Sequence, residues 1–261
     1  MFELRYLHHL DRDAKPLRIG SMTHKLLEQH NLCKESGQTF TPEMPEGADP
    51  DEWLVVEKLY NAYNREYGID DIAIIQPEVK ATAYFGTVTT VKNKWEIWLV
   101  GTLDGIIQDG GLYLEEYKTC ANLGAAQFAK FMNDYQITAY MWMAKKALQI
   151  TLDGARITLL PKTKDPQPAR IRVVRTAHQF QEWERTTLHE VKSMIQCLEA
   201  RYHPQRMTSC TNWNRACMFQ DYCMTGEESN LVDLIPRGPD YTDDKRQELE
   251  RLAGEEALVG T

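Results

Sequence analysis

Residues 101–118, GTLDGIIQDGGLYLEEYK, constrain the fold more than any other part of this sequence. Two runs rich in β-branched, aliphatic and aromatic residues flank the Asp-Gly-Gly turn at 109–111. Such runs joined by Gly-rich turn residues predict an antiparallel β-hairpin. A three-residue loop would pair Gln108 with Leu112, and this register determines which side chains face each other farther along the strands.

The predicted register brings two carboxylates together, because it places Asp104 opposite Glu116. Directly opposed residues lie about 5 Å apart, and Lys118 would point to the same face as Glu116 because strand side chains alternate. A hard cation such as Mg²⁺ or Mn²⁺ relieves the repulsion between two neighbouring carboxylates. A slip of one residue would exchange Glu116 for Glu115. The bare pattern also fits an ordinary half-exposed strand with a solvated acid and lysine.

The order of predicted elements indicates an α/β fold with a mixed sheet and helices on its faces. Apolar spacing and turn residues predict four helices, at 17–32, 53–67, 125–149 and 178–202. Strand-like segments occur at 78–90, 94–107, 112–118, 155–161 and 170–175. A Pro-, Gly- and acid-rich stretch at 34–52 predicts an exposed loop.

Charge and hydropathy narrow the functional classes. The 261 residues have a net charge of −8, and residues 227–261 alone hold 10 acids and 4 bases, a balance of −6. Such a chain does not coat nucleic acid by bulk charge, although a local basic groove stays compatible with it. No apolar stretch is long enough to cross a membrane. The N-terminus lacks an apolar signal core, so we expect a cytoplasmic protein.

Four short motifs occur in order along the chain. They are Gly20-x-x-x-His24, Gly101-x-x-Asp104, Glu116-x-Lys118 and Gln136-x-x-x-Tyr140. Together they resemble the RecB-like branch of the PD-(D/E)XK nuclease superfamily over roughly residues 2–225. The resemblance implies a restriction-endonuclease-like core, with a central mixed β-sheet flanked by α-helices. It also implies a single nuclease domain over 1–226, followed by an acidic, flexible C-terminal segment at 227–261.

The resemblance implies a role for each motif residue. His24, Asp104, Glu116 and the Tyr117 backbone carbonyl would hold Mg²⁺ or Mn²⁺, and Lys118 would act on the attacking water or the scissile phosphate. Gln136 and Tyr140 lie four residues apart on one helix face, where they would support the site or contact DNA. Glu78, at the start of the preceding strand, is a secondary candidate for a place near the cation. Taken alone, His24 also fits a capping or core histidine, and Tyr140 fits core packing.

Three of the six cysteines, Cys210, Cys217 and Cys223, cluster within 205–226. RecB-like nucleases often hold a [4Fe–4S] cluster with three such cysteines and a fourth near the N-terminus, and clusters normally have four thiolate ligands. Here the fourth ligand is missing, unless Cys33 or His8 replaces it or the chain begins late. Zinc is an alternative, and three simply buried thiols are another.

The resemblance implies a metal-dependent DNA nuclease, more specifically an exonuclease, of recombination, repair, phage replication or CRISPR adaptation. The alternatives are a non-catalytic DNA-binding or scaffold subunit that retains the fold, and a redox or cluster-sensing protein. DNA is the expected partner. A helicase or recombination partner protein, the oligomeric state, the cleavage polarity and the strand preference stay open.

Overall fold

The fold is that of a computed structural model, and the residues it describes are 10–11, 14–68, 72–205, 210–212, 215–231 and 235–236. The chain forms two compact units. Residues 15–192 make up the larger unit, which contains all four motifs, and residues 1–14 and 193–261 make up the smaller one. Most of the expected acidic segment at 227–261 lies outside the described residues.

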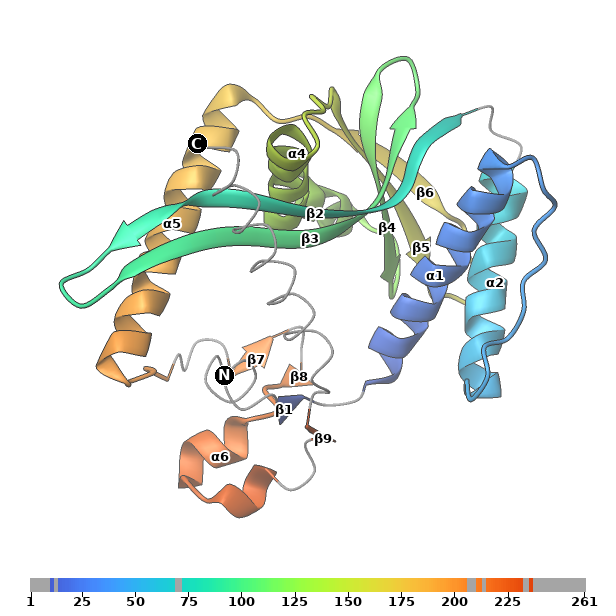
Figure 1. The fold of residues 1–261 in the computed structure, drawn as a ribbon. Coiled ribbons are helices and arrows are strands. Elements are labelled where there is room, and N and C mark those ends of the chain that lie inside the picture. The colour runs from blue at the N-terminus through green and yellow to red at the C-terminus, as the bar shows by residue number, and fades with distance from the viewer. Residues whose placement is uncertain are drawn as a thin grey trace. The chain divides into compact units, whose positions relative to one another are not determined.

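The larger unit is built on a five-stranded sheet with the strand order β2-β3-β4-β5-β6 (Figure 1). Its strands are β2 (Ala73–Thr89), β3 (Lys94–Gln108), β4 (Leu112–Cys120), β5 (Gly154–Pro161) and β6 (Ala169–Val173). Neighbours are antiparallel except β4 and β5, which are parallel and therefore need a long crossover between them. The predicted mixed sheet is confirmed.

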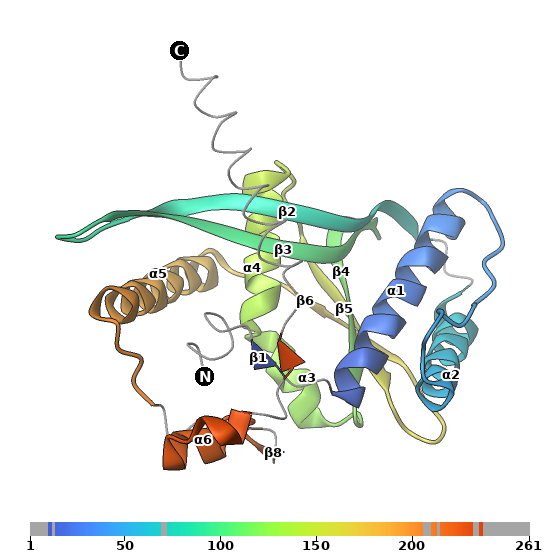
Figure 2. The ribbon, with the colours of Figure 1, turned by 60° about the horizontal axis from the view of Figure 1, so that its bottom comes forward.

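The sheet divides at β3. This strand pairs with β4 only from Gly105↔Glu115 to Gln108↔Leu112, as the predicted hairpin register requires. Beyond Gly105, β3 stays paired with β2 alone, back to Lys94↔Thr89. Figure 2 shows these two strands leaving the sheet together as a long β-ribbon, formed by residues 79–89 and 94–103.

Helices α1 (Lys15–Glu35) and α2 (Pro50–Tyr67) lie side by side and cover one face of β4 and β5 (Figure 1). Their buried contacts with the sheet include Leu27 and Leu59, which pack in one cluster with Tyr117 and Leu160. The connection between the two helices is the exposed stretch 36–49, slightly shorter than the loop expected at 34–52.

A second core lies beneath the β-ribbon and on the opposite face of β4 and β5. It contains Ile137, Trp142 and Trp183 packed with Leu114 and Ile157. The helices that contribute are α3 (Ala125–Met132), α4 (Tyr135–Ala147) and α5 (Ala177–Ala200).

The prediction of one helix over 125–149 was wrong, because the chain breaks at Asn133-Asp134 between α3 and α4. Asp134 has extended backbone angles, and its carboxylate accepts hydrogen bonds from the backbone N–H groups of Gln136 and Ile137, at 2.9 and 3.1 Å. Aspartate favours this capping geometry over a helix interior. The cap places Gln136 in the first turn of α4.

Apart from the end of α5, the described elements of the smaller unit are short. Strand β1 (Leu10–Asp11) pairs with β9 (Ile235–Pro236), and β7 (Thr211–Asn212) pairs with β8 (Arg215–Ala216). A short helix, α6 (Gln220–Thr225), and a 3₁₀ turn, η3 (Glu228–Leu231), follow. None of the helices described in either unit has the length and apolarity needed to span a bilayer.

Candidate active site

Two motif glycines allow close approach between helices and strands at the site. A Cβ at Gly101 would lie 2.8 Å from Cε1 of Tyr140, so a side chain at this position of β3 would displace the Tyr140 ring of α4. A Cβ at Gly20 would lie 3.6 Å from Oγ1 of Thr119, which is an ordinary contact. The glycine of the Asp104 motif therefore has a steric reason that the glycine of the His24 motif lacks.

Asp104 lies where β3 leaves β4, and both of its oxygens are hydrogen-bonded. Oδ1 is 3.0 Å from Nδ1 of His24 on α1. Oδ2 accepts the backbone N–H of Tyr117 on β4, at 2.7 Å. One carboxylate therefore connects α1, β3 and β4.

Glu116 is the buried acid of the site, with only 2% of its side chain exposed. Its Oε1 lies 2.5 Å from Nζ of Lys118, whereas Oε2 is buried without a hydrogen-bond partner among the described residues. Burial, followed by the nearby charge of Asp104, raises the pKa of Glu116 from 4.5 to about 7, although Lys118 and the charge of His24 lower it. A buried carboxylate oxygen without a partner is costly, which makes it a natural position for a cation ligand.

Lys118 connects the acids to α4. Besides Glu116, its Nζ donates to Oε1 of Gln136 at 2.9 Å, and Nε2 of Gln136 donates to the hydroxyl of Tyr140 at 2.7 Å. The side chain of Lys118 is 25% exposed, so its ammonium group stays accessible while two partners orient it.

Opposing effects act on the pKa of His24. Burial lowers its pKa, but the hydrogen bond to Asp104 and the negative charges of Asp104 and Glu116 outweigh that effect and leave the pKa above 6.5. Because the neutral ring nitrogen is the metal ligand, a cation at these acids would favour loss of the proton from His24.

Glu115 is excluded from this site by its position on the opposite face of β4. Its carboxylate contacts Nε of Arg156 at 2.5 Å and accepts from Oγ1 of Thr158 at 2.9 Å. Only 1% of the residue is exposed, and burial raises its pKa despite the Arg156 charge. The hairpin register therefore directs Glu116, and not Glu115, toward His24 and Asp104.

Two further acids lie next to these residues. Glu78, the secondary candidate from the sequence, falls between the pairs Pro77↔Gly105 and Val79↔Leu103. This register puts it beside Asp104. Its φ of 27° is unusual for a residue other than glycine. The sequence analysis did not identify Glu28. Its pKa is raised by burial, followed by the charge and hydrogen bond of Glu78 and the charge of Asp104. Its spacing of four residues from His24 in one helix could have revealed it.

The arrangement fits a hard divalent cation in its donor types, which are carboxylates and one imidazole. No three His, Cys, Asp or Glu side chains within the described ranges already surround a common point as metal ligands do. The carboxylate oxygens do not converge on such a point because most of them already accept hydrogen bonds. N–H donors of His24, Tyr117 and Lys118 satisfy three of the four oxygens of Asp104 and Glu116. A bound cation would replace some of these donors, and Oε2 of Glu116 has none to replace.

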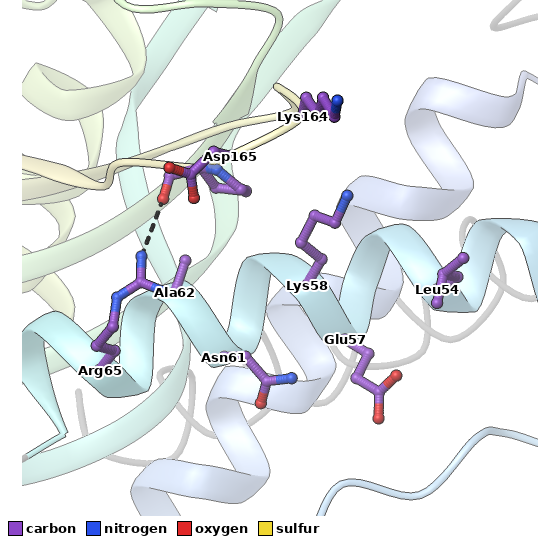
Figure 3. A pocket seen from close by; sticks show the side chains of 9 residues that line it. Leu54, Glu57, Lys58, Asn61, Ala62, Arg65, Lys164 and Asp165 are labelled. Atoms are coloured by element: carbon purple, nitrogen blue, oxygen red, sulfur yellow. Dashed lines mark hydrogen bonds between the residues drawn. The ribbon is translucent and has the colours of Figure 1, made fainter.

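Two surface pockets of the larger unit contain none of these residues. One lies outside α2, where Lys58 and Arg65 face Lys164 and Asp165 of the β5–β6 connection (Figure 3). Arg65 donates to the carbonyl of Pro166 at 3.3 Å, and acids and bases alternate around this pocket. The other is a largely apolar groove between α1 and the 36–49 stretch. Neither presents a catalytic set of side chains.

The three clustered cysteines belong to the smaller unit. The β7–β8 pair Thr211↔Ala216 makes Cys210 and Cys217 neighbours, and the N–H of Cys217 donates to the carbonyl of Cys210 at 2.7 Å. Cys217 and Cys223 pack against the buried ring of Phe219. None of the three forms a disulfide bond with another described residue. The N-terminal segment before residue 10, including His8, lies outside the described residues, and Cys33 is in α1 of the larger unit.

An Asp, a Glu and a Lys therefore lie where the mixed sheet divides, and a Gln and a Tyr on α4 continue their hydrogen-bond network. The PD-(D/E)XK nuclease superfamily model matches residues 1–224, and the chain belongs to this superfamily. A solved structure of a putative exonuclease from Eubacterium rectale is similar, with a TM-score of 0.50 and 17% identity over 83% of this chain and 82% of that one.

A second solved structure, SSO0001, has a TM-score of 0.30 and 12% identity over 65% of this chain and 86% of that one. A search of curated protein sequences gave no match. Family membership agrees with Mg²⁺ or Mn²⁺ as the cation.

Proposed function

We propose that this protein is a Mg²⁺- or Mn²⁺-dependent DNA nuclease that hydrolyses phosphodiester bonds. The observation that supports it best is the unbroken polar network from Glu116 through Lys118 and Gln136 to Tyr140. Family membership supports the hydrolytic reaction. Resemblance to the RecB-like motifs extends the proposal to an exonuclease.

The proposed ligands of the cation are His24, Asp104, Glu116 and the Tyr117 carbonyl. A divalent cation at such ligands polarises a phosphoryl oxygen and lowers the pKa of a bound water. Glu116 and Gln136 hold Lys118 with its ammonium group at the surface of the site. There it would orient the attacking water or stabilise negative charge that develops on the phosphate. Tyr140 acts through Gln136 and is therefore a positioning residue.

Cleavage of end-labelled linear DNA and of closed circular DNA, each with Mg²⁺, Mn²⁺ or EDTA, tests this proposal. We expect metal-dependent cutting that Lys118→Ala reduces at least about a hundredfold, since the lysine would contact the reacting group. Lys145→Ala, an exposed lysine on α4, is the matched control and should cut normally. Cutting of the linear substrate alone would identify an exonuclease.

The same assay separates the alternative function. DNA binding without cutting in either metal would identify a DNA-binding subunit that retains the nuclease fold. Full activity of Lys118→Ala would remove the catalytic role that the proposal gives to this residue.

For the smaller unit we propose an iron–sulfur cluster held by Cys210, Cys217 and Cys223. The adjacency of Cys210 and Cys217 and the packing of Cys217 and Cys223 around Phe219 support a common site. The three thiolates leave one ligand position to be supplied by another group. Visible absorption together with iron, sulfide and zinc analysis of anaerobically purified protein is the test. Zinc without iron would favour a zinc site, and neither metal would leave three packed thiols.

A further inference from the structure

One face of the β-ribbon runs outward from the candidate active site. Side chains alternate along each strand, so the residues that share a face with Glu78 and Asp104 follow directly from the register. Moving outward, they form the pairs Lys80↔Thr102, Thr82↔Val100, Tyr84↔Trp98, Thr87↔Glu96 and Thr89↔Lys94. These pairs are called the outer ribbon face below. The bulge between Tyr84 and Gly86 preserves the alternation, because its extra residue, Phe85, turns inward.

The other face of the ribbon is occupied by protein. Ala81 and Ala83 are buried in the core that contains α4, and the ring of Phe85 lies 5.4 Å from that of Trp142. The outer ribbon face stays accessible, and 43% of the surface of Tyr84 is exposed although the residue is large and aromatic. The two faces therefore differ in what they contact, and only the inner one is explained by folding.

The chemistry of the outer ribbon face suits an unpaired nucleic-acid strand. Tyr84 and Trp98 form a cross-strand aromatic pair with ring centroids 5.2 Å apart, and exposed aromatic rings stack on bases. Threonine hydroxyls can donate to phosphate oxygens. The charged residues of the outer ribbon face are Lys80, Lys94 and Glu96, a balance of +1 in a chain whose net charge is −8. This local positive balance favours a polyanion over an apolar or basic protein surface.

The spacing also fits a strand that leaves the site. Trp98 is six residues from Asp104 along β3, which is about 20 Å at roughly 3.3 Å per residue. A strand stacked as in a duplex advances about 3.4 Å per phosphate and an extended single strand advances more, so this distance corresponds to at most about six nucleotides. Bases in a duplex are already stacked and paired, whereas those of a single strand are free to stack on protein rings.

We propose that the outer ribbon face binds single-stranded nucleic acid within about six nucleotides of the scissile phosphate. The proposal rests on the proposed nuclease function and adds to it a substrate form and a second contact region. It makes Tyr84 and Trp98 the stacking residues, with Lys80 and Lys94 as phosphate contacts on either side of them.

Fluorescence anisotropy on the full chain tests the proposal, with Lys118→Ala present throughout to prevent cutting and Mg²⁺ in the buffer. The probes are labelled oligothymidylates of about four and about twelve nucleotides and a blunt duplex. Trp98→Leu should weaken binding of the longer oligomer about tenfold, because one stacked base is lost, and should change the shorter one less than about twofold. Trp95→Leu is the matched control, since Trp95 pairs with Val88 on the other face.

A second variant tests the charges without altering the aromatic pair. Lys80→Gln combined with Lys94→Gln should lower the salt dependence of binding by about 1.4 in log K against log salt, or about 0.7 for each phosphate contact. Equal losses for Trp98→Leu and Trp95→Leu, or a loss for the duplex as large as for the long oligomer, would overturn the proposal.

The experiments distinguish failure of the strand-binding proposal from failure of the proposed nuclease function. Metal-dependent cutting by the wild type, with binding unaffected in Trp98→Leu, would reject the outer ribbon face alone. Binding that depends on Trp98 in a protein that never cuts would reject the nuclease reaction and retain the strand-binding surface.

Discussion

The two motif glycines, Gly101 and Gly20, should respond oppositely to alanine. A Cβ at Gly101 would lie 2.8 Å from the Tyr140 ring, so the ring must move by about 0.6 Å to reach ordinary contact. Overpacking of this kind costs about 1–3 kcal/mol. A Cβ at Gly20 meets Thr119 at 3.6 Å, without a clash. Alanine inside a helix is favoured over glycine by about 0.5–1 kcal/mol, so Gly20→Ala should be neutral or stabilising.

Thermal unfolding measures the difference. For a unit of this size, 1 kcal/mol shifts Tm by about 2–4 °C, so Gly101→Ala should melt about 2–12 °C below the wild type and Gly20→Ala at or above it. Displacement of Tyr140 also moves Gln136 and hence Lys118, and cleavage by Gly101→Ala should fall about tenfold or more.

A double-mutant cycle identifies the cause. In a Tyr140→Leu background the ring is absent, so Gly101→Ala should cost at least about 1 kcal/mol less than it does in the wild type. The reasoning fails if Gly101→Ala melts with the wild type, if Gly20→Ala is equally destabilised, or if the cost of Gly101→Ala is unchanged without the ring.

Three further predictions concern buried and orienting groups. The pKa of Glu116 is raised above its ordinary value, so its contribution to stability is complete below pH 4.5 and is lost as pH rises through about 7. The metal-free protein should lose up to roughly 3 kcal/mol over that window in chemical unfolding through Glu116, and added Mg²⁺ should stabilise it more at the upper end. Glu116→Gln should remove this part of the pH dependence. Arg156→Met leaves the buried Glu115 carboxylate without the guanidinium group that it contacts, and should cost about 3–5 kcal/mol in the same measurement, whereas a cost below about 1 kcal/mol would contradict this assignment. Gln136→Leu removes one hydrogen bond from Lys118, and should slow cleavage about tenfold with an unchanged Tm; an unchanged rate would show that Gln136 does not position the lysine.

The sequence was sufficient to predict features that depend on nearby residues. The Asp-Gly-Gly turn determines the pairing of Gln108 with Leu112, and strand alternation then distinguishes Glu116 from Glu115. The spacing of Gln136 and Tyr140 similarly predicts a shared helix face, and the two side chains are hydrogen-bonded. All of these relations act over a few residues or across one turn.

The sequence did not predict features that depend on tertiary packing. The periodic apolar pattern of 125–149 concealed the break at Asp134, because a capping aspartate resembles any exposed helical acid in sequence. Glu28 reaches the site only because α1 docks against the start of β2, a contact that spans fifty residues of chain. The accessible outer ribbon face likewise depends on where β3 leaves β4.

The hydrogen bond from the Tyr117 N–H to Asp104 has a consequence for how this site tolerates change. At the point where the β3–β4 ladder ends, a carboxylate takes the place of the next backbone acceptor. The same side chain therefore terminates a sheet and contributes to the candidate reaction centre. Loss of Asp104 would leave a main-chain donor without its acceptor and separate two strands, so a reduced rate in an Asp104 variant would combine a chemical and an architectural defect. Lys118, partly exposed at the edge of the network, is the position at which chemistry can be removed with the least damage to the scaffold.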